Sequence, residues 1–238
     1  MTPLTRNARV AGLLYLVASA VGVLRLIVIP GRLFVTGDAA VTAGNIAAHE
    51  GLFRLGIVSY VLSAALWLFV PLALYRLLHM VDRELAVLMV ILGSLVQVPL
   101  FLVNSVTDAG ALLFVRGTDV ASAFSQPHRE AFAGILLDLH HHLDLVNAVF
   151  WGLWLFPFGI LVYRSRFLPR IIGVWLILAG CGWLSYSMAG LLSPGLDDVV
   201  NTYIQPLTLG EVVAMFWLLV VGAREHPGTP RVDMSVRS

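Results

Sequence analysis

A run of three consecutive histidines is the strongest candidate for chemistry in the sequence. A helix places His140 and Asp144 one turn apart on the same face. An imidazole and a carboxylate in this arrangement are typical ligands of zinc, and neutral imidazole also suits iron, including the iron of a haem. Asp138 with His141 or His142 has the same one-turn spacing. The run predicts a metal site at His140, His141 and Asp144, with Glu50 or Glu211 available as a further ligand. The alternative is a partly solvated histidine cluster without a metal, because consecutive residues of a helix point in different directions.

Two longer polar stripes accompany this run. The positions of each stripe are separated by four, three and four residues, so each occupies one face of a helix. They comprise Gln97, Phe101, Asn104 and Asp108 in one segment, and His140, Asp144, Asn147 and Trp151 in the other. Facing stripes on antiparallel helices either line a binding site or hydrogen-bond the helices to each other. The sequence leaves both interpretations open.

Glu211 is a further candidate, since it precedes a wholly apolar run and follows Pro206 by five residues. We expect the last helix to begin near Leu207, which places Glu211 about one turn inside it. A carboxylate there could act as a general base, a metal ligand or a proton-relay group. The alternative is a structural ion pair with Arg25 or Arg54.

The composition identifies the kind of protein that must position these groups. Hydrophobic residues make up 59% of the 238 residues and charged residues 12%, with a mean hydropathy of +0.89. Soluble domains are roughly 45–50% apolar and about 25% charged, which excludes a soluble enzyme, a nucleic-acid-binding protein and a disordered regulator. The single cysteine, Cys181, cannot form an internal disulfide. P-loop, dinucleotide-binding and hydrolase nucleophile motifs are also absent from the sequence.

Hydropathy predicts an all-α bundle of about six transmembrane helices between residues 10 and 223. A bilayer core of ~30 Å requires ~20 apolar residues per helix. The predicted spans are 10–29, 55–78, 85–107, 144–163, 171–192 and 207–223, and the third and fourth belong to longer helical patterns at 84–117 and 127–163. Kinks are expected at Pro71, Pro99 and Pro157. The first span is too long for a cleaved signal peptide, so we expect it to remain attached.

The arginines predict the orientation. With residues 1–9 in the cytoplasm, the outer segments hold only four of the 15 arginines, namely Arg32, Arg54, Arg116 and Arg129. Arg25 lies within the first span, and the remaining arginines fall on the inner side. Positive residues favour the cytoplasmic side, so we expect both termini there, with residues 224–238 as a disordered tail.

Polar residues gather in the outer halves of the spans, which predicts a polar pocket open to the outer side above a dry inner floor. Tyr15 and Tyr75, in the inner halves, are expected to be interfacial anchors. In the first outer loop, Gly37 and Asp38 are expected to cap a short helix from Ala39 to about Glu50, lying at the interface or over the pocket as a lid. The predicted pocket residues are Glu50, Arg54, Asn104, Asp108, His140, Asp144, Asn147 and Glu211.

An ordered string of short motifs adds a resemblance. It contains Gly37-Asp38-Ala39, Asn45-Ile46, Glu50 to Gly56, Phe150-Trp151-Gly152, Arg164-Ser165, Phe167 to Arg170, Ala179-Gly180 and Gly210-Glu211. From about Arg9 to Gly222 the chain resembles the domain-of-unknown-function family DUF4386, a set of small multi-spanning membrane proteins of bacteria. The resemblance implies a plasma-membrane location and emphasises Glu50, Arg54 and Glu211 as motif positions. It carries no activity, substrate or cofactor.

Three functions follow from these observations. The chain is a structural or accessory membrane protein whose polar residues hold helices together, or it binds a small or lipid-like ligand that enters the pocket from the outer leaflet. The alternative is an intramembrane metal-dependent hydrolase or redox protein, in which zinc or iron activates water and Glu211 acts as general base. The lipid bilayer is the expected partner in all three.

Overall fold

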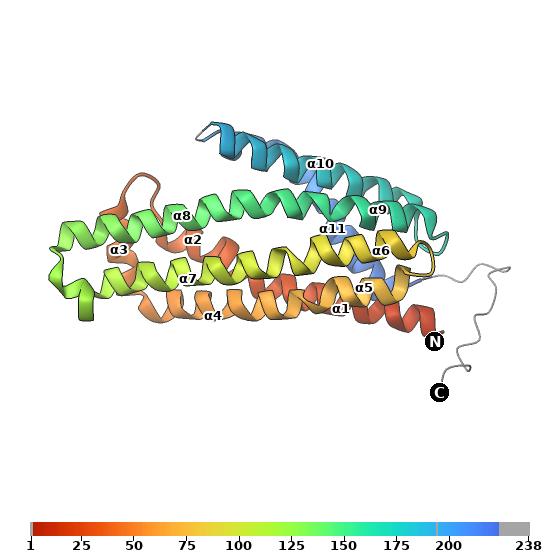
Figure 1. Ribbon diagram of the computed structural model, residues 1–238, viewed down its shortest axis with the longest axis horizontal. Helices are drawn as coiled ribbons and strands as arrows, with labels where there is room; N and C mark the ends of the chain where they lie inside the picture. The colour runs from red at the N-terminus through yellow and green to blue at the C-terminus, as the bar shows by residue number, and fades with distance from the viewer. Residues whose placement is uncertain (1, 194, 224–238) are drawn as a thin grey trace.

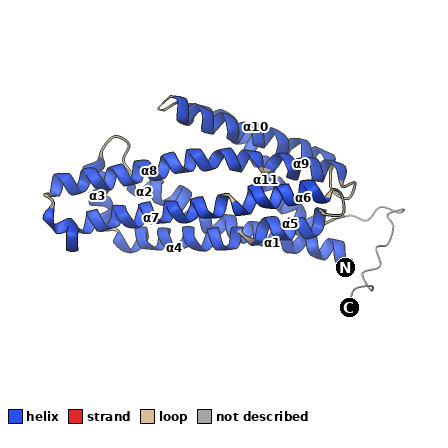
Figure 2. Cartoon of the chain, viewed as in Figure 1, coloured by secondary structure: helices blue, strands red, loops and turns tan. Residues whose placement is uncertain are grey.

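The computed structural model describes residues 2–193 and 195–223, and every regular element in those ranges is a helix (Figure 2). The predicted disordered tail, residues 224–238, lies outside the described residues. The helices run side by side along one long axis, and both ends of the described chain lie at the same end of the bundle (Figure 1). We call this the terminal end and the opposite one, where α3 lies, the distal end.

Among the described residues, six helical segments are long and apolar enough to cross a membrane, which confirms the predicted fold class. Most are built from shorter helices in direct succession. They are Pro3–Leu33 (α1 Pro3–Val23, η1 Leu24–Val28, α2 Ile29–Leu33), Glu50–Leu78 (α4 Glu50–Trp67, α5 Phe69–Leu78), Arg83–Arg116 (α6 Arg83–Val90, η2 Ile91–Leu95, α7 Gln97–Arg116), Gln126–Arg164 (α8 Gln126–Leu153, α9 Leu155–Arg164), Arg170–Leu192 (α10) and Leu196–Val221 (α11 Leu196–Phe216, η4 Trp217–Val221).

The three kinks expected at prolines have a direct physical cause. A proline has no N–H to donate to the carbonyl four residues earlier. Helices α4 and α8 end at Trp67 and Leu153, four residues before Pro71 and Pro157, and the π-helical turn η2 ends four residues before Pro99. The missing hydrogen bond therefore coincides with each break.

The last helix begins before Pro206, and not just after it as the sequence predicted. It starts at Leu196 rather than near Leu207 and continues through Pro206. Asp197 and Asp198 in its first turn favour this start electrostatically, and the indole of Trp175 donates a hydrogen bond to the carbonyl of Pro206. Glu211 consequently lies about 22 Å along a helix of 26 residues, close to its middle.

Helices α7 and α8 extend the bundle at the distal end. Gln126–Arg164 has 39 residues, about 58 Å, which is far more than a ~30 Å bilayer core needs. The predicted short helix is present beside them as α3 (Ala39–Ala48), where the carboxylate of Asp38 accepts a hydrogen bond from the amide of Val41 at 2.9 Å. The side chain of Asn45 ties α3 back to the carbonyl of Leu33.

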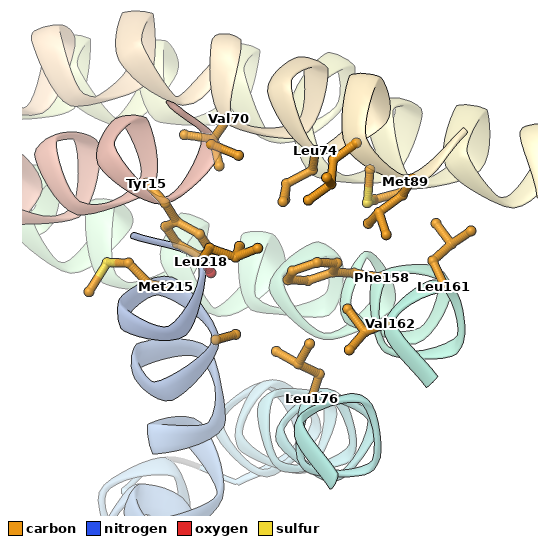
Figure 3. Close-up of a cluster of buried hydrophobic side chains, with 14 of the residues drawn as sticks. Tyr15, Val70, Leu74, Met89, Phe158, Leu161, Val162, Leu176, Met215 and Leu218 are labelled. Atoms are coloured by element: carbon orange, nitrogen blue, oxygen red, sulfur yellow. The ribbon is translucent and has the colours of Figure 1, made fainter. Parts of the chain in front are cut away.

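An apolar core fills the terminal half of the bundle. Its side chains come from α1, α5, α6, α9, α10 and the last segment, and Figure 3 shows them converging, with Tyr15 extending from α1 toward Met215 and Leu218. Close approach of α10 to the fourth segment depends on glycine: a Cβ on Gly152 would lie 2.7 Å from the carbonyl oxygen of Gly180. Small residues permit such backbone contact between membrane helices. Helix α10 stays packed on α8 beyond this contact, since the hydroxyl of Ser187 donates a hydrogen bond to the carbonyl of Leu145 at 2.7 Å.

Candidate functional site

Arg25 and Asp108 form a buried ion pair between the first and third segments. The guanidinium donates from Nε and Nη2 to the two carboxylate oxygens, each at 2.6 Å. The side chains are 3% and 0% exposed. A bidentate pair of this kind is the geometry in which arginine binds a carboxylate most specifically. Arg25 reaches it from the π-helical turn η1.

His140 extends this pair into the fourth segment. Its Nδ1 lies 3.1 Å from Asp108 and its Nε2 lies 3.3 Å from Asp144. Asp144 also accepts hydrogen bonds from the hydroxyl of Tyr60 at 3.0 Å and from the amide of Asn104 at 2.6 Å. We call these six residues, Arg25, Tyr60, Asn104, Asp108, His140 and Asp144, the Arg25 network.

The Arg25 network is an interhelical connection rather than an open polar surface. It joins four segments, and five of its members are almost completely buried. A guanidinium and a protonated imidazole would balance its two carboxylates, so a compensated cluster can be held inside the bundle. The two polar stripes therefore do face each other, as the sequence suggested, and they bond across the bundle.

A separate cavity of about 320 Å³ lies next to this network, toward the terminal end. Its wall is rich in aromatic residues, and it is formed by α1, η1, α4, α7, α8, α10 and α11 together with Trp154, which lies between α8 and α9. The aromatic lining residues are Tyr15, Tyr60, Trp67, Phe101, Trp151, Trp154 and Trp183. Tyr60 belongs to both structures, since its ring lines the cavity while its hydroxyl bonds Asp144.

Glu211 supplies the carboxylate of the cavity. Its Oε2 accepts a hydrogen bond from the hydroxyl of Tyr15 at 2.6 Å, and its Oε1 accepts one from the indole of Trp183 at 2.7 Å. The predicted ion pair of Glu211 with Arg25 or Arg54 is wrong, because Arg25 binds Asp108 and Arg54 binds Glu50 at 2.7 Å. The helix start at Leu196 explains the difference, since it carries Glu211 toward Tyr15 in the middle of α1.

Most of the predicted pocket residues lie outside the cavity. Glu211 lines it, whereas Asn104, Asp108, His140 and Asp144 belong to the network. Asn147 is fully buried, and neither its amide nitrogen nor its oxygen has a hydrogen-bond partner. Glu50 and Arg54 form an exposed ion pair, and the same carboxylate oxygen of Glu50 lies 3.6 Å from Nε of Arg116. Helix α3 contributes nothing to the lining, so it is no lid over this cavity.

The three histidines diverge, as expected for consecutive helical residues. His140 enters the network, His141 lies 2.9 Å from Asp197 of α11, and His142 lies 3.7 Å from Asp138. Within residues 2–193 and 195–223, no group of three or more His, Cys, Asp or Glu side chains is arranged to hold a metal ion. Metal binding by His140, His141 and Asp144 stays a prediction without support from this geometry.

Sequence reasoning missed the role of Tyr15. The prediction of an interfacial anchor is wrong, because its side chain is 3% exposed and binds Glu211. A signal was available in the spacing of Tyr15, Ser19, Gly22 and Leu26, which follow one face of the first segment and all line the cavity. The aromatic nature of the wall was also missed, since its aromatic residues come from five different segments.

Comparison with known proteins identifies the family of this chain. The family model described as "Domain of unknown function (DUF4386)" matches residues 10–222. The chain belongs to this family. It is also 27% identical over 143 residues to an uncharacterized protein of Archaeoglobus fulgidus, an alignment that covers 55% of this chain and 85% of the archaeal protein. No solved structure matches the chain. Since six helices of the described residues are long and apolar enough to cross a membrane, this DUF4386 member is a multi-pass membrane protein.

Proposed function

We propose that this DUF4386 protein binds a small or lipid-like ligand in the aromatic cavity. The main observation in support is the cavity itself, a space of about 320 Å³ inside the bundle, next to a large apolar core. Ligand sites are typically concave, mostly apolar and equipped with a few polar groups that orient the ligand. Glu211, Ser19, Ser63 and Thr208 are the polar groups here.

Access from the lipid phase follows from the exposed lining residues. Val23 and Leu26 on one side, and Val212 on the other, line the cavity and are 40–41% exposed. The cavity thus opens on the lipid-facing surface between the first and last segments. The apolar core around Leu218 and Phe158 closes its terminal side, which argues against a continuous channel.

With the orientation that we propose from the arginines, the ligand would enter the cavity from the outer leaflet of the bacterial plasma membrane. Arg6, Arg9, Arg76, Arg83, Arg164 and Arg170 all lie in the segments at the terminal end. Positive residues favour the cytoplasm, so the terminal end and both termini would be cytoplasmic. Reporter fusions at the C-terminus test this: a periplasmic C-terminus would overturn the outer-leaflet entry.

Ligand occupancy can be tested by filling the cavity. We expect native mass spectrometry of the detergent-purified protein to detect a co-purifying small molecule or lipid. Ser19→Phe should remove it, because the new ring occupies the space beside Tyr15, whereas Val17→Phe on the lipid-facing side of the same helix should retain it. Equal retention in both variants would overturn the proposal.

A structural or accessory role is the second candidate, and the Arg25 network favours it. The network links four segments through buried polar bonds without contributing an open site. Under that role, Ser19→Phe would leave the function of the protein in the cell unchanged, while disruption of Asp108 would abolish it.

A further inference from the structure

Glu211 has no positively charged partner among the described residues, and this indicates the charge of the ligand; this inference rests on the proposed binding function. Both donors to Glu211, the Tyr15 hydroxyl and the Trp183 indole, are electrically neutral. None of the ion pairs within residues 2–193 and 195–223 includes Glu211. An ionised group in a membrane interior requires a partner of opposite charge or water. The cavity beside it is where a counter-charge can enter.

The aromatic wall favours the same kind of ligand. Aromatic faces carry negative charge density and attract cations, and rings combined with a carboxylate are a typical site for ammonium groups. Contacts between rings hold the wall in place: Tyr15 meets Trp67 edge-on at 5.2 Å between centroids, and Trp151 meets Trp183 at 5.1 Å. Trp183 therefore both bonds Glu211 and belongs to the wall.

The charges of the other lining residues further limit the class of ligand that the cavity can bind. Among the described residues that line the cavity, Glu211 is the one with a formal charge, and arginine and histidine are absent. A phospholipid headgroup would bring an anionic phosphate without a counter-charge and beside a carboxylate. The apolar walls also suit bulky hydrocarbon groups better than a hydrated inorganic ion.

We propose that the cavity binds a hydrophobic organic cation, an amine or quaternary ammonium without an anionic group, with its charge against Glu211 and its apolar groups against the tryptophans. The cation would enter from the lipid phase between Leu26 and Val212, where hydrophobic cations partition. Glu211 then distinguishes ligands by the sign of their charge, and the aromatic wall contributes affinity for their size and shape.

Two ions of nearly identical shape and opposite charge test this proposal. Tetraphenylphosphonium and tetraphenylborate are titrated separately into the detergent-purified full-length protein, and their Kd values are measured by equilibrium dialysis. We expect the phosphonium Kd of the wild type to be at least about tenfold lower than the borate Kd. Glu211→Gln should raise the phosphonium Kd at least about tenfold and leave the borate Kd unchanged or lower.

The variant is designed to keep its local structure. A glutamine can accept the Trp183 hydrogen bond through Oε1 and donate through Nε2 to the Tyr15 hydroxyl, so both contacts can persist. Glu84→Gln, an exposed carboxamide substitution in α6, is the matched control and should leave both Kd values unchanged. A melting temperature of Glu211→Gln near that of the wild type shows that the variant is folded.

The outcomes separate this inference from the proposed function. Equal affinity for the two ions, or equal phosphonium affinity in wild type and Glu211→Gln, overturns the cation proposal. In either case a co-purifying ligand that Ser19→Phe removes would leave the proposed function standing. Failure of both ions to bind, together with the absence of a co-purifying ligand, would overturn both.

Discussion

Tyr15 and Glu211 are 196 residues apart in the sequence, and the hydroxyl of the first donates a 2.6 Å hydrogen bond to the carboxylate of the second. This bond joins the first helix to the last at the level of the cavity. It also positions the carboxylate, together with Trp183, on the aromatic wall. The first and last segments are thereby connected directly at the candidate site.

Removal of the Tyr15 hydroxyl tests this connection. We expect Tyr15→Phe to destabilise the protein by about 1–3 kcal/mol, because Glu211 loses one of its two neutral donors inside the bundle. The melting temperature in detergent provides the measurement. Tyr163→Phe, at a half-exposed tyrosine of α9, should change it little. Equal melting temperatures for the two variants would contradict the role assigned to Tyr15.

Separation of Arg25 from Asp108 should have a larger effect. Asp108→Ala leaves a buried guanidinium without its carboxylate, and breaking one side of a buried pair typically costs 3–5 kcal/mol. Glu50→Ala breaks an exposed ion pair with Arg54, four residues further along the same helix. The loss of such a pair typically costs about 0.3–0.5 kcal/mol of stability. Thermal unfolding of both variants makes the comparison.

A double substitution distinguishes the ion pair from simple loss of packing. Arg25→Met combined with Asp108→Leu removes both charges, so it should recover much of the stability that Asp108→Ala loses. A double variant that is less stable than either single variant would contradict this account of the buried pair.

The contact between Gly152 and Gly180 should tolerate no side chain. Gly152→Leu is expected to prevent close packing of α10 on α8, since even a Cβ would lie 2.7 Å from a backbone oxygen. Size-exclusion profiles and expression level in membranes measure the effect. Gly31→Leu is the control, because a Cβ there meets nothing within 4 Å, and normal behaviour of both variants would show that the helices do not pack as described.

The histidine run offers a direct test of the metal-dependent alternative. Because His141 bonds Asp197 and lies apart from His140 and Asp144, we expect His141→Ala to leave the zinc and iron content of the purified protein unchanged. Elemental analysis of wild type and variant gives the answer. Near-stoichiometric metal in the wild type that disappears in His141→Ala would restore the enzyme interpretation.

Local patterns in the sequence determined the helices. The six apolar segments, the capped helix after Asp38 and the breaks before Pro71 and Pro157 depend on hydropathy and on backbone bonds within a few residues. The spacing of the polar stripes likewise determined which side chains of α7 and α8 share a face. Such features are independent of how the helices are arranged.

Tertiary structure alone decided which distant side chains meet. The partner of Arg25 lies 83 residues away and that of Glu211 lies 196 residues away, and both depend on the rotation and depth of each helix in the bundle. Because the last helix starts earlier than expected, Glu211 has Tyr15 as its partner instead of the expected arginine. The aromatic wall arises in the same way, because five of the six segments each contribute one or two rings that no single segment brings together.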